Sequence, residues 1–153
     1  MSTKMKKMIA VIAVTLLAAF VHPAFAGEQY KGLLIAEKTL EGYALRYSLL
    51  NPDERKEVVK GMEGMKMPGM SDSPDVTHHL ALYIKGTDGK PVSGKIGFNI
   101  TNPDGTAFKT MTMGFPGGYG ADVMFKAKGI YKIRMKAVIA GKTINDETSF
   151  EVK

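Results

Sequence analysis

The sequence contains no cysteine. This absence excludes disulfide scaffolds, thiol redox enzymes, cysteine-ligated zinc sites and covalently attached c-type haem. It also leaves no acceptor for the lipid group of a bacterial lipoprotein. The fold must therefore be held together by its hydrophobic core alone.

An apolar run long enough to span a bilayer is also missing. The run from Met8 to Val21 has 14 residues, below the ~18 that a membrane-spanning helix needs. Three lysines precede this run, and the small-x-small sequence Ala24-Phe25-Ala26 follows it. This order is typical of a secretory signal peptide, residues 1–26, with cleavage after Ala26. We expect export to the bacterial periplasm and one mature domain, residues 27–153, without a membrane span.

The expected mature domain has little net charge. Removing the three lysines of the signal peptide leaves 18 of the 21 Lys and Arg residues against 15 Asp and Glu residues. The remaining lysines are scattered among acids, so nothing favours a nucleic-acid partner. Ser71-Asp72-Ser73 is typical of a solvated turn, and the glycine-rich stretch 114–120 lacks the lysine and helix of a phosphate loop. The sequence therefore does not favour an enzyme.

Apolar and polar residues alternate with a period of two along most of the mature domain, which is the pattern of half-buried strands. The rows fall at 43–49, 78–84, 96–100, 108–113, 121–125, 131–139 and 148–152, and the apolar stretch 33–36 completes a first hairpin. We predict an all-β fold, an Ig-like antiparallel β-sandwich of about seven to eight strands. Gly129-Ile130-Tyr131 suits a tyrosine corner, although Tyr131 could equally be an ordinary core aromatic.

One long segment, residues 51–76, shows no sustained periodicity and exceeds the usual length of a connection between strands. Glu54 to Lys60 could form a helical turn or two, which Gly61 would end. The segment also carries four of the eight methionines of the mature domain: Met62, Met65, Met67 and Met70. Their glycine, proline and charged neighbours do not form a core. A thioether is a soft, uncharged ligand that favours monovalent copper, so this methionine loop (residues 62–70) is a candidate copper site.

Two histidines, His78 and His79, stand where the methionine loop enters the next strand. Adjacent strand residues point to opposite faces, so His78 should point inward with Leu80 and His79 should point outward. We prefer His78 as the imidazole ligand, with His79 as the alternative if the loop folds over the outer face. Met111 and Met113 end another strand, and their spacing places both thioethers on one face. If that strand end lies beside His78, then His78, Met113 and a loop methionine form a composite site.

Each of these features also has an interpretation without metal. The loop methionines could bind a protein partner promiscuously or react with oxidants. Met111 and Met113 could pack under the following glycine-rich loop, and the histidines could be ordinary polar residues at a strand start. Met124 and Met135 lie in strand rows and should be structural.

Several motifs of the second half of the chain recur together in one family. They are the histidine before Leu80-Ala81-Leu82, the turn from Asp88 to Gly94, Met111-Thr112-Met113-Gly114, and Gly118-Tyr119-Gly120-Ala121-Asp122 ahead of Gly129-Ile130-Tyr131. With them, residues 77–153 resemble the small periplasmic Ig-like domains of the YtkA-like group. This resemblance implies a periplasmic sandwich that handles copper through His78, Met111 and Met113. The first hairpin and the methionine loop fall outside the pattern.

The sequence thus predicts a periplasmic accessory protein or chaperone that binds copper, as Cu(I), through methionine and histidine. Its partners would be the metal ion and another periplasmic or membrane protein of metal handling. The alternative is a non-enzymatic structural or interaction module whose methionine loop docks a protein partner without metal. A sacrificial oxidant trap is a third interpretation.

Overall fold

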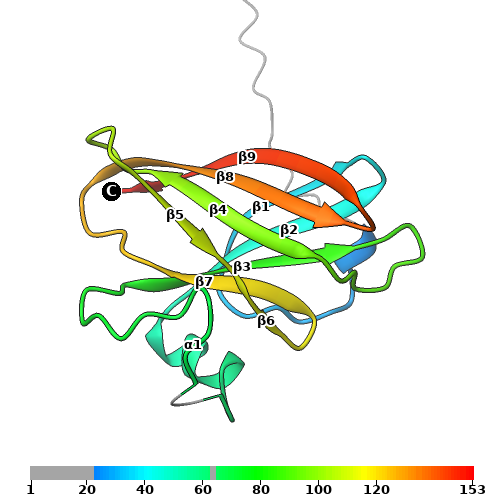
Figure 1. Cartoon of the computed structure of the whole chain (residues 1–153), viewed down its shortest axis with the longest axis horizontal. Helices are drawn as coiled ribbons and strands as arrows, with labels where there is room; N and C mark the ends of the chain where they lie inside the picture. Colours follow the sequence, from blue (N-terminus) through cyan, green and yellow to red (C-terminus); the bar gives the residue numbers. More distant parts are fainter. Residues whose placement is uncertain (1–22, 63–64) are drawn as a thin grey trace, which may run out of the picture.

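The computed structural model describes residues 23–62 and 65–153. Within these residues, nine strands form two antiparallel sheets that pack face to face (Figure 1). The strands are β1 (Leu33–Leu40), β2 (Tyr43–Leu50), β3 (His78–Lys85), β4 (Lys95–Thr101), β5 (Ala107–Met111), β6 (Met113–Phe115), β7 (Gly118–Val123), β8 (Gly129–Ile139) and β9 (Lys142–Val152). The all-β sandwich predicted from the period-two pattern is therefore confirmed.

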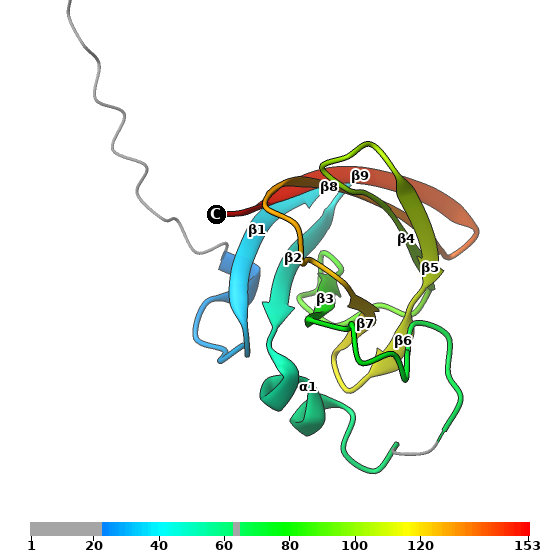
Figure 2. The same cartoon turned by 90° about the vertical axis from the view of Figure 1, so that its left-hand side faces the viewer.

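The first sheet has five strands in the order β1-β2-β3-β7-β6, and the second has four in the order β5-β4-β8-β9. The core lies between the two layers (Figure 2). β8 shows how the pattern produces this core: every second residue from Tyr131 to Ile139 is buried, and the residues between them are exposed. Met135 lies in this buried row as expected. Met124 is exposed instead, because β7 ends one residue before it.

Tyr131 forms the tyrosine corner that its sequence context suits. Its hydroxyl donates a hydrogen bond to the carbonyl oxygen of Ala127 at 2.8 Å. Its ring lies 4.4 Å from the ring of Phe125, measured between centroids. The contact fixes the connection between β7 and β8 at one end of the sandwich.

The chain changes from one sheet to the other at Thr112. β5 ends at Met111 in the four-stranded sheet, and β6 begins at Met113 in the five-stranded sheet. The amide and hydroxyl of Thr112 both donate to the carbonyl of Ile96, at 2.9 and 2.8 Å. The prediction that the thioethers of Met111 and Met113 share a face is therefore wrong, since alternation holds only within one continuous strand. The same break raises the strand count above the predicted seven or eight.

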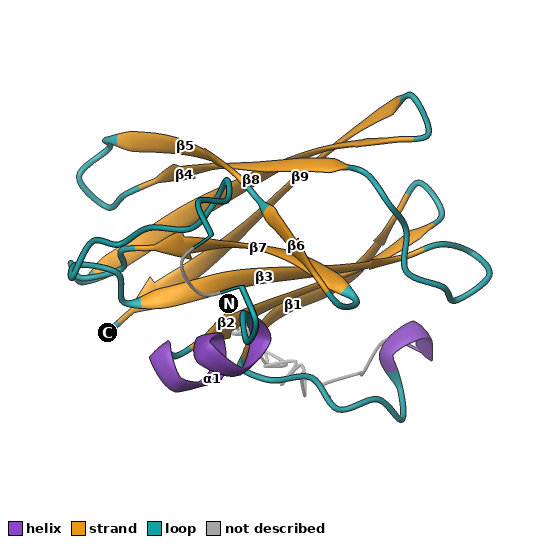
Figure 3. Cartoon of the chain, turned by 60° about the horizontal axis from the view of Figure 1, so that its bottom comes forward, coloured by secondary structure: helices purple, strands orange, loops and turns teal. Residues whose placement is uncertain are grey.

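Three segments lie over the outer face of the five-stranded sheet (Figure 3). They are the 3-10 turn η1 (Pro23–Phe25), the helix α1 (Pro52–Val58) and the irregular chain after α1. The predicted helical turns are confirmed, and Asn51 begins the helix. The side chain of Asn51 accepts from the Glu54 amide at 2.9 Å, and the Glu54 side chain accepts from the Asn51 amide at 3.1 Å. This reciprocal cap satisfies two backbone donors that the first turn would leave free.

Most of the expected signal peptide, residues 1–22, lies outside the described residues. Phe25, just before the expected cleavage point, is 1% exposed and packs on the five-stranded sheet with Tyr83 and Ala81. Cleavage after Ala26 stays a prediction. In residues 23–62 and 65–153, no helix is long and apolar enough to cross a bilayer.

Candidate metal centre

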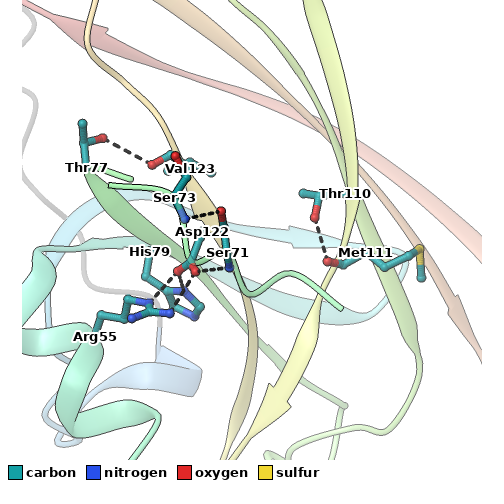
Figure 4. Close-up of polar contacts among 9 residues, drawn as sticks. All are labelled: Arg55, Ser71, Ser73, Thr77, His79, Thr110, Met111, Asp122 and Val123. Atoms are coloured by element: carbon teal, nitrogen blue, oxygen red, sulfur yellow. Dashed lines mark hydrogen bonds and ion pairs between the residues drawn. The ribbon is translucent and has the colours of Figure 1, made fainter. Parts of the chain in front are cut away.

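A buried aspartate joins four segments on the outer face of the five-stranded sheet. Asp122 lies on β7, and its side chain has no exposed surface. Its Oδ1 accepts from His79 Nδ1 at 2.9 Å and from Arg55 Nε at 2.6 Å. Its Oδ2 accepts from Arg55 Nη2 at 2.9 Å and from the Ser71 amide at 2.7 Å. β3, β7, α1 and the chain before β3 therefore converge on one carboxylate (Figure 4).

Strand register brings His79 to this aspartate. In the antiparallel pair of β3 and β7, His79 lies directly opposite Asp122, so both side chains project from the outer face. The sequence predicts that His79 points outward, and the structure confirms it. The ring is nevertheless fully buried, because Arg55 and the chain around Ser71 close over it.

The charge of Asp122 determines which nitrogen of His79 carries hydrogen. Burial by itself would raise the pKa of Asp122, but hydrogen bonds from His79, Arg55 and the Ser71 amide outweigh burial and hold the pKa below its ordinary value. An ionised carboxylate only accepts hydrogen bonds. The hydrogen between the two side chains therefore belongs to Nδ1 of His79, and Nε2 is the ring nitrogen that Asp122 does not bind.

This second nitrogen, Nε2 of His79, is buried and has no hydrogen-bond partner among the described residues. It lies directly over Gly120, where a Cβ would come within 2.2 Å of it. Glycine is thus the residue that leaves room for the ring at this position. A buried polar atom without a partner costs about 1–3 kcal/mol, and such an atom marks a candidate ligand site.

Met113 shares the outer face with His79. It lies opposite Gly120 in the pair of β6 and β7, and Gly120 is two residues from Asp122 on the same strand. Its side chain therefore projects from the face that carries Asp122 and His79. Met113 is 1% exposed and belongs to neither of the hydrophobic clusters. A buried thioether and a buried imidazole thus flank the bare backbone of Gly120.

The methionine loop is docked against this strand edge through Gly69. The amide of Asp122 donates to the carbonyl of Gly69 at 2.6 Å. A Cβ on Gly69 would come within 2.7 Å of the Met111 carbonyl oxygen and 3.2 Å of the Met113 amide nitrogen, and its φ of +81° also favours glycine. Beyond Met113, where β6 begins, Gly69 of the loop therefore takes the place next to β7. At Gly69 the loop backbone lies against the backbone of Met113, and the composite site with a loop methionine stays a prediction.

The four loop methionines differ in their exposure. Met67 and Met70 stand on either side of Gly69, and both are half-buried. Met62 is also half-buried, whereas Met65 is 56% exposed. Met70 and Met67 are the loop methionines closest in sequence to Gly69, one and two residues away.

His78, the preferred histidine of the sequence prediction, lies at a different place. It is in register with the inward row of β3, and its Nδ1 lies 2.9 Å from the hydroxyl oxygen of Thr77. Burial lowers the pKa of His78. His78 and Met70 both line a surface hollow of about 480 Å³ between α1 and the chain before β3. His78 therefore does not join Met113, but it shares this hollow with a loop methionine.

Met111 is separated from the buried group. Its side chain is 50% exposed on the outer face of the four-stranded sheet, opposite Gly97. Figure 4 shows it pointing away from His79 and Asp122. Its carbonyl oxygen, by contrast, lies against Gly69 of the methionine loop.

Sequence reasoning missed Arg55, Gly120 and Asp122 as parts of this site. Asp122 alternates with the buried residues Ala121 and Val123, which could have indicated an outward acid on a strand. Nothing in the sequence indicates that it lies opposite His79. Among the described residues, no three His, Asp or Glu side chains are placed to hold a metal ion together. A metal site here would therefore depend on thioethers.

No protein-family model, no curated protein and no solved structure matches this chain. The resemblance to YtkA-like domains stays a prediction. The geometry around Asp122 is thus the basis for any statement about function.

Proposed function

We propose that this protein is an envelope copper carrier that holds a monovalent copper ion between His79, Met113 and a methionine of the loop. The observation that carries the proposal is the buried Nε2 of His79, which has no partner and lies over Gly120 beside Met113. Export and the periplasmic location remain part of the proposal, because they rest on the sequence of residues 1–26.

The donor set favours a soft monovalent ion. Imidazole and thioether groups bind copper(I) as neutral ligands, whereas Mg²⁺, Ca²⁺ and Mn²⁺ prefer carboxylate and carbonyl oxygen. The bond from Nδ1 of His79 to Asp122 is the arrangement in which a carboxylate orients a metal-binding histidine. Met67 or Met70 would supply the third ligand, because both flank the docked Gly69. Copper bound there would give Nε2 a partner, once a shift of the ring away from Gly120 makes room for the ion.

Loading requires the methionine loop to move, since His79 is fully buried. The hollow lined by His78 and Met70 opens to solvent between α1 and the chain before β3. We propose it as the entry point, where an ion meets one imidazole and one thioether before it reaches His79. Exchange of one ligand at a time suits a carrier that releases its cargo to another protein.

An anaerobic titration of copper(I) against a competing chelator tests the proposal. His79→Gln and Met113→Leu should each weaken binding by at least about tenfold, as loss of even an outer partner of a metal ligand does. Met111→Leu is the matched control for Met113→Leu and should change affinity little. Equal affinities for all variants and the parent protein would contradict the proposal.

A spectroscopic measurement on the parent protein avoids any effect of substitutions on folding. Silver(I) is a diamagnetic monovalent probe that can replace copper(I) in nitrogen-15 NMR. Its addition should shift the Nε2 signal of His79 and leave Nδ1 protonated. A shift at His78 alone would place the ion in the surface hollow instead and overturn the assignment to His79.

The second candidate function is docking of a protein partner without metal. Its support is Met65, which is 56% exposed in the loop, because flexible thioethers adapt to many partner surfaces. Association with an envelope protein that survives a copper chelator and is lost in Met65→Ser would favour this function over the first.

A further inference from the structure

Within residues 23–62 and 65–153, no other segment covers the outer face of the four-stranded sheet. The turn η1, the helix α1 and the methionine loop all lie on the other sheet, and Figure 3 shows no described helix or loop over β4, β5, β8 and β9 on this side. In β8 every outward residue from Ile130 to Val138 is exposed. A surface of this extent is available for contact with another molecule.

This face is also strongly basic. Five cations project from it: Lys95, Lys109, Lys132, Arg134 and Lys136. The same side of β9 carries two acids, Glu147 and Glu151, and Glu147 is paired with Arg134 at 2.8 Å. The face therefore has an excess of three positive charges. This equals the excess of the whole expected mature domain, which has 18 Lys and Arg and 15 Asp and Glu. We call this surface the basic face.

The basic face is hollowed into an open groove of about 870 Å³. Among the residues that line it are Gly97, Asn99, Lys109, Met111, Arg134 and Lys136. The sulfur of Met111 lies over Gly97, where a Cβ would be 3.2 Å from it. Its charged lining comprises the cations Lys109, Arg134 and Lys136 and the acids Asp146 and Glu147, and Met111 adds one half-exposed thioether.

We propose that the basic face docks an acidic, extended segment of the protein that exchanges copper with this one. The identity of the partner rests on the proposed function, whereas the docking itself is inferred from the groove and from the charge of the basic face. Lys132, Arg134 and Lys136 alternate on β8, so their Cα atoms are about 6.5–7 Å apart. An extended peptide with acids at every second position repeats at the same distance.

A polypeptide fits this surface better than a membrane does. A bilayer of acidic lipids is flat and would contact the rim of the groove rather than its floor. The floor also holds the Oδ1 of Asn99, which is buried and has no hydrogen-bond donor among the described residues. A backbone N–H of an extended peptide that reaches the floor can supply that donor.

The groove ends beside the methionine loop. Met111 lines the groove with its side chain, while its carbonyl oxygen lies against Gly69 of the loop. A partner in the groove would therefore lie next to both a free thioether and the segment that closes the proposed copper site. Docking there places the exchange partner where the loop must open.

Fluorescence anisotropy with a short labelled peptide that has glutamate at every second position tests the docking. The protein expressed from its full-length gene should bind this peptide at low salt, and added salt should weaken binding by screening the charges. Lys132→Glu with Lys136→Glu should weaken binding at least about fivefold, because each lost exposed ion pair contributes a modest factor. Lys56→Glu with Lys90→Glu changes the net charge equally, away from the groove, and should have a much smaller effect.

Three results would overturn this inference: no binding of the peptide, equal weakening by the two double variants, or tighter binding to vesicles of phosphatidylglycerol and phosphatidylcholine than to the peptide. Copper(I) affinity should be the same in the Lys132→Glu, Lys136→Glu variant and the parent protein. Peptide binding without copper binding would contradict the proposed function alone. Copper binding without peptide binding would contradict the docking alone.

Discussion

The outer faces of the two sheets differ in how far they are covered. The outer face of the five-stranded sheet is covered by α1, η1 and the methionine loop, and its polar groups are buried around Asp122. That of the four-stranded sheet is open, and its charged groups are solvated. The exposure of an arginine–carboxylate pair therefore differs between the two faces. The Asp122 side chain in the Arg55–Asp122 pair is 0% exposed, whereas both side chains of the Arg134–Glu147 pair are more than half exposed. The covered face carries the proposed copper site, and the open face carries the proposed docking groove.

The largest expected effect comes from Asp122→Ala. It leaves His79 Nδ1, the Arg55 guanidinium and the Ser71 amide without their acceptor, which should cost about 3–5 kcal/mol of unfolding free energy. Denaturant titration measures the loss. Glu147→Ala, the equivalent change on the open face, should leave the unfolding free energy nearly unchanged. Similar losses in the two variants would remove the distinction between the faces.

A methyl group at Gly120 should have the next largest effect. Gly120→Ala places a Cβ 2.2 Å from His79 Nε2, and such overpacking should cost about 1–3 kcal/mol. It should also weaken copper(I) binding, because the ring must move. Gly114→Ala is the control, since a Cβ there has no heavy atom within 4 Å. If both variants unfold at the same denaturant concentration as the parent, the ring does not lie over Gly120.

Acid should destabilise the covered face through Asp122. Its folded pKa is lowered below the ordinary value of 3.8, so its stabilising contribution is fully present above that pH and is lost as the pH falls through the folded pKa. Thermal unfolding between neutral and acid pH should show this loss. The unfolding temperature of Asp122→Asn should fall less steeply with acid pH than that of the parent protein. An unchanged fall would mean that other carboxylates cause the acid sensitivity.

The smallest effect should come from the open-face pair. A hydrogen bond from Arg134 lowers the pKa of Glu147, but the pair is solvated and salt screens it. Its contribution to acid sensitivity, measured as the difference between the parent and Glu147→Gln, should disappear in high salt. The contribution of Asp122 should persist there. A salt-resistant effect of Glu147 would show that this face is less open to solvent than its side-chain exposure indicates.

Much of the fold could be predicted because it follows from local pattern. The row from Tyr131 to Ile139 predicts a half-buried strand, and β8 is one. The prediction failed at Thr112, where two apolar residues two apart belong to different sheets. A change of sheet depends on hydrogen bonds to Ile96, and no local pattern indicates such a bond.

The candidate site could be predicted only in part. The sequence indicates His79 as an outward residue and the loop methionines as unlikely to form a core, and both features follow from neighbours along the chain. It could not indicate that Asp122, which is 43 residues beyond His79 in the sequence, lies opposite it on the neighbouring strand. The preference for His78 rested on its inward position at the strand start beside the loop, and strand register instead brings His79 to the buried carboxylate.

The sequence by itself determined the class of fold and the types of ligand. Alternation specifies which side of a strand is buried, and composition supplies thioethers and imidazoles while excluding thiols. Only the tertiary structure decided which of these side chains lie on the same face. Strand register, the change of sheet at Thr112 and the docking of Gly69 are contacts between distant segments, and the free energy of packing these segments together selects them.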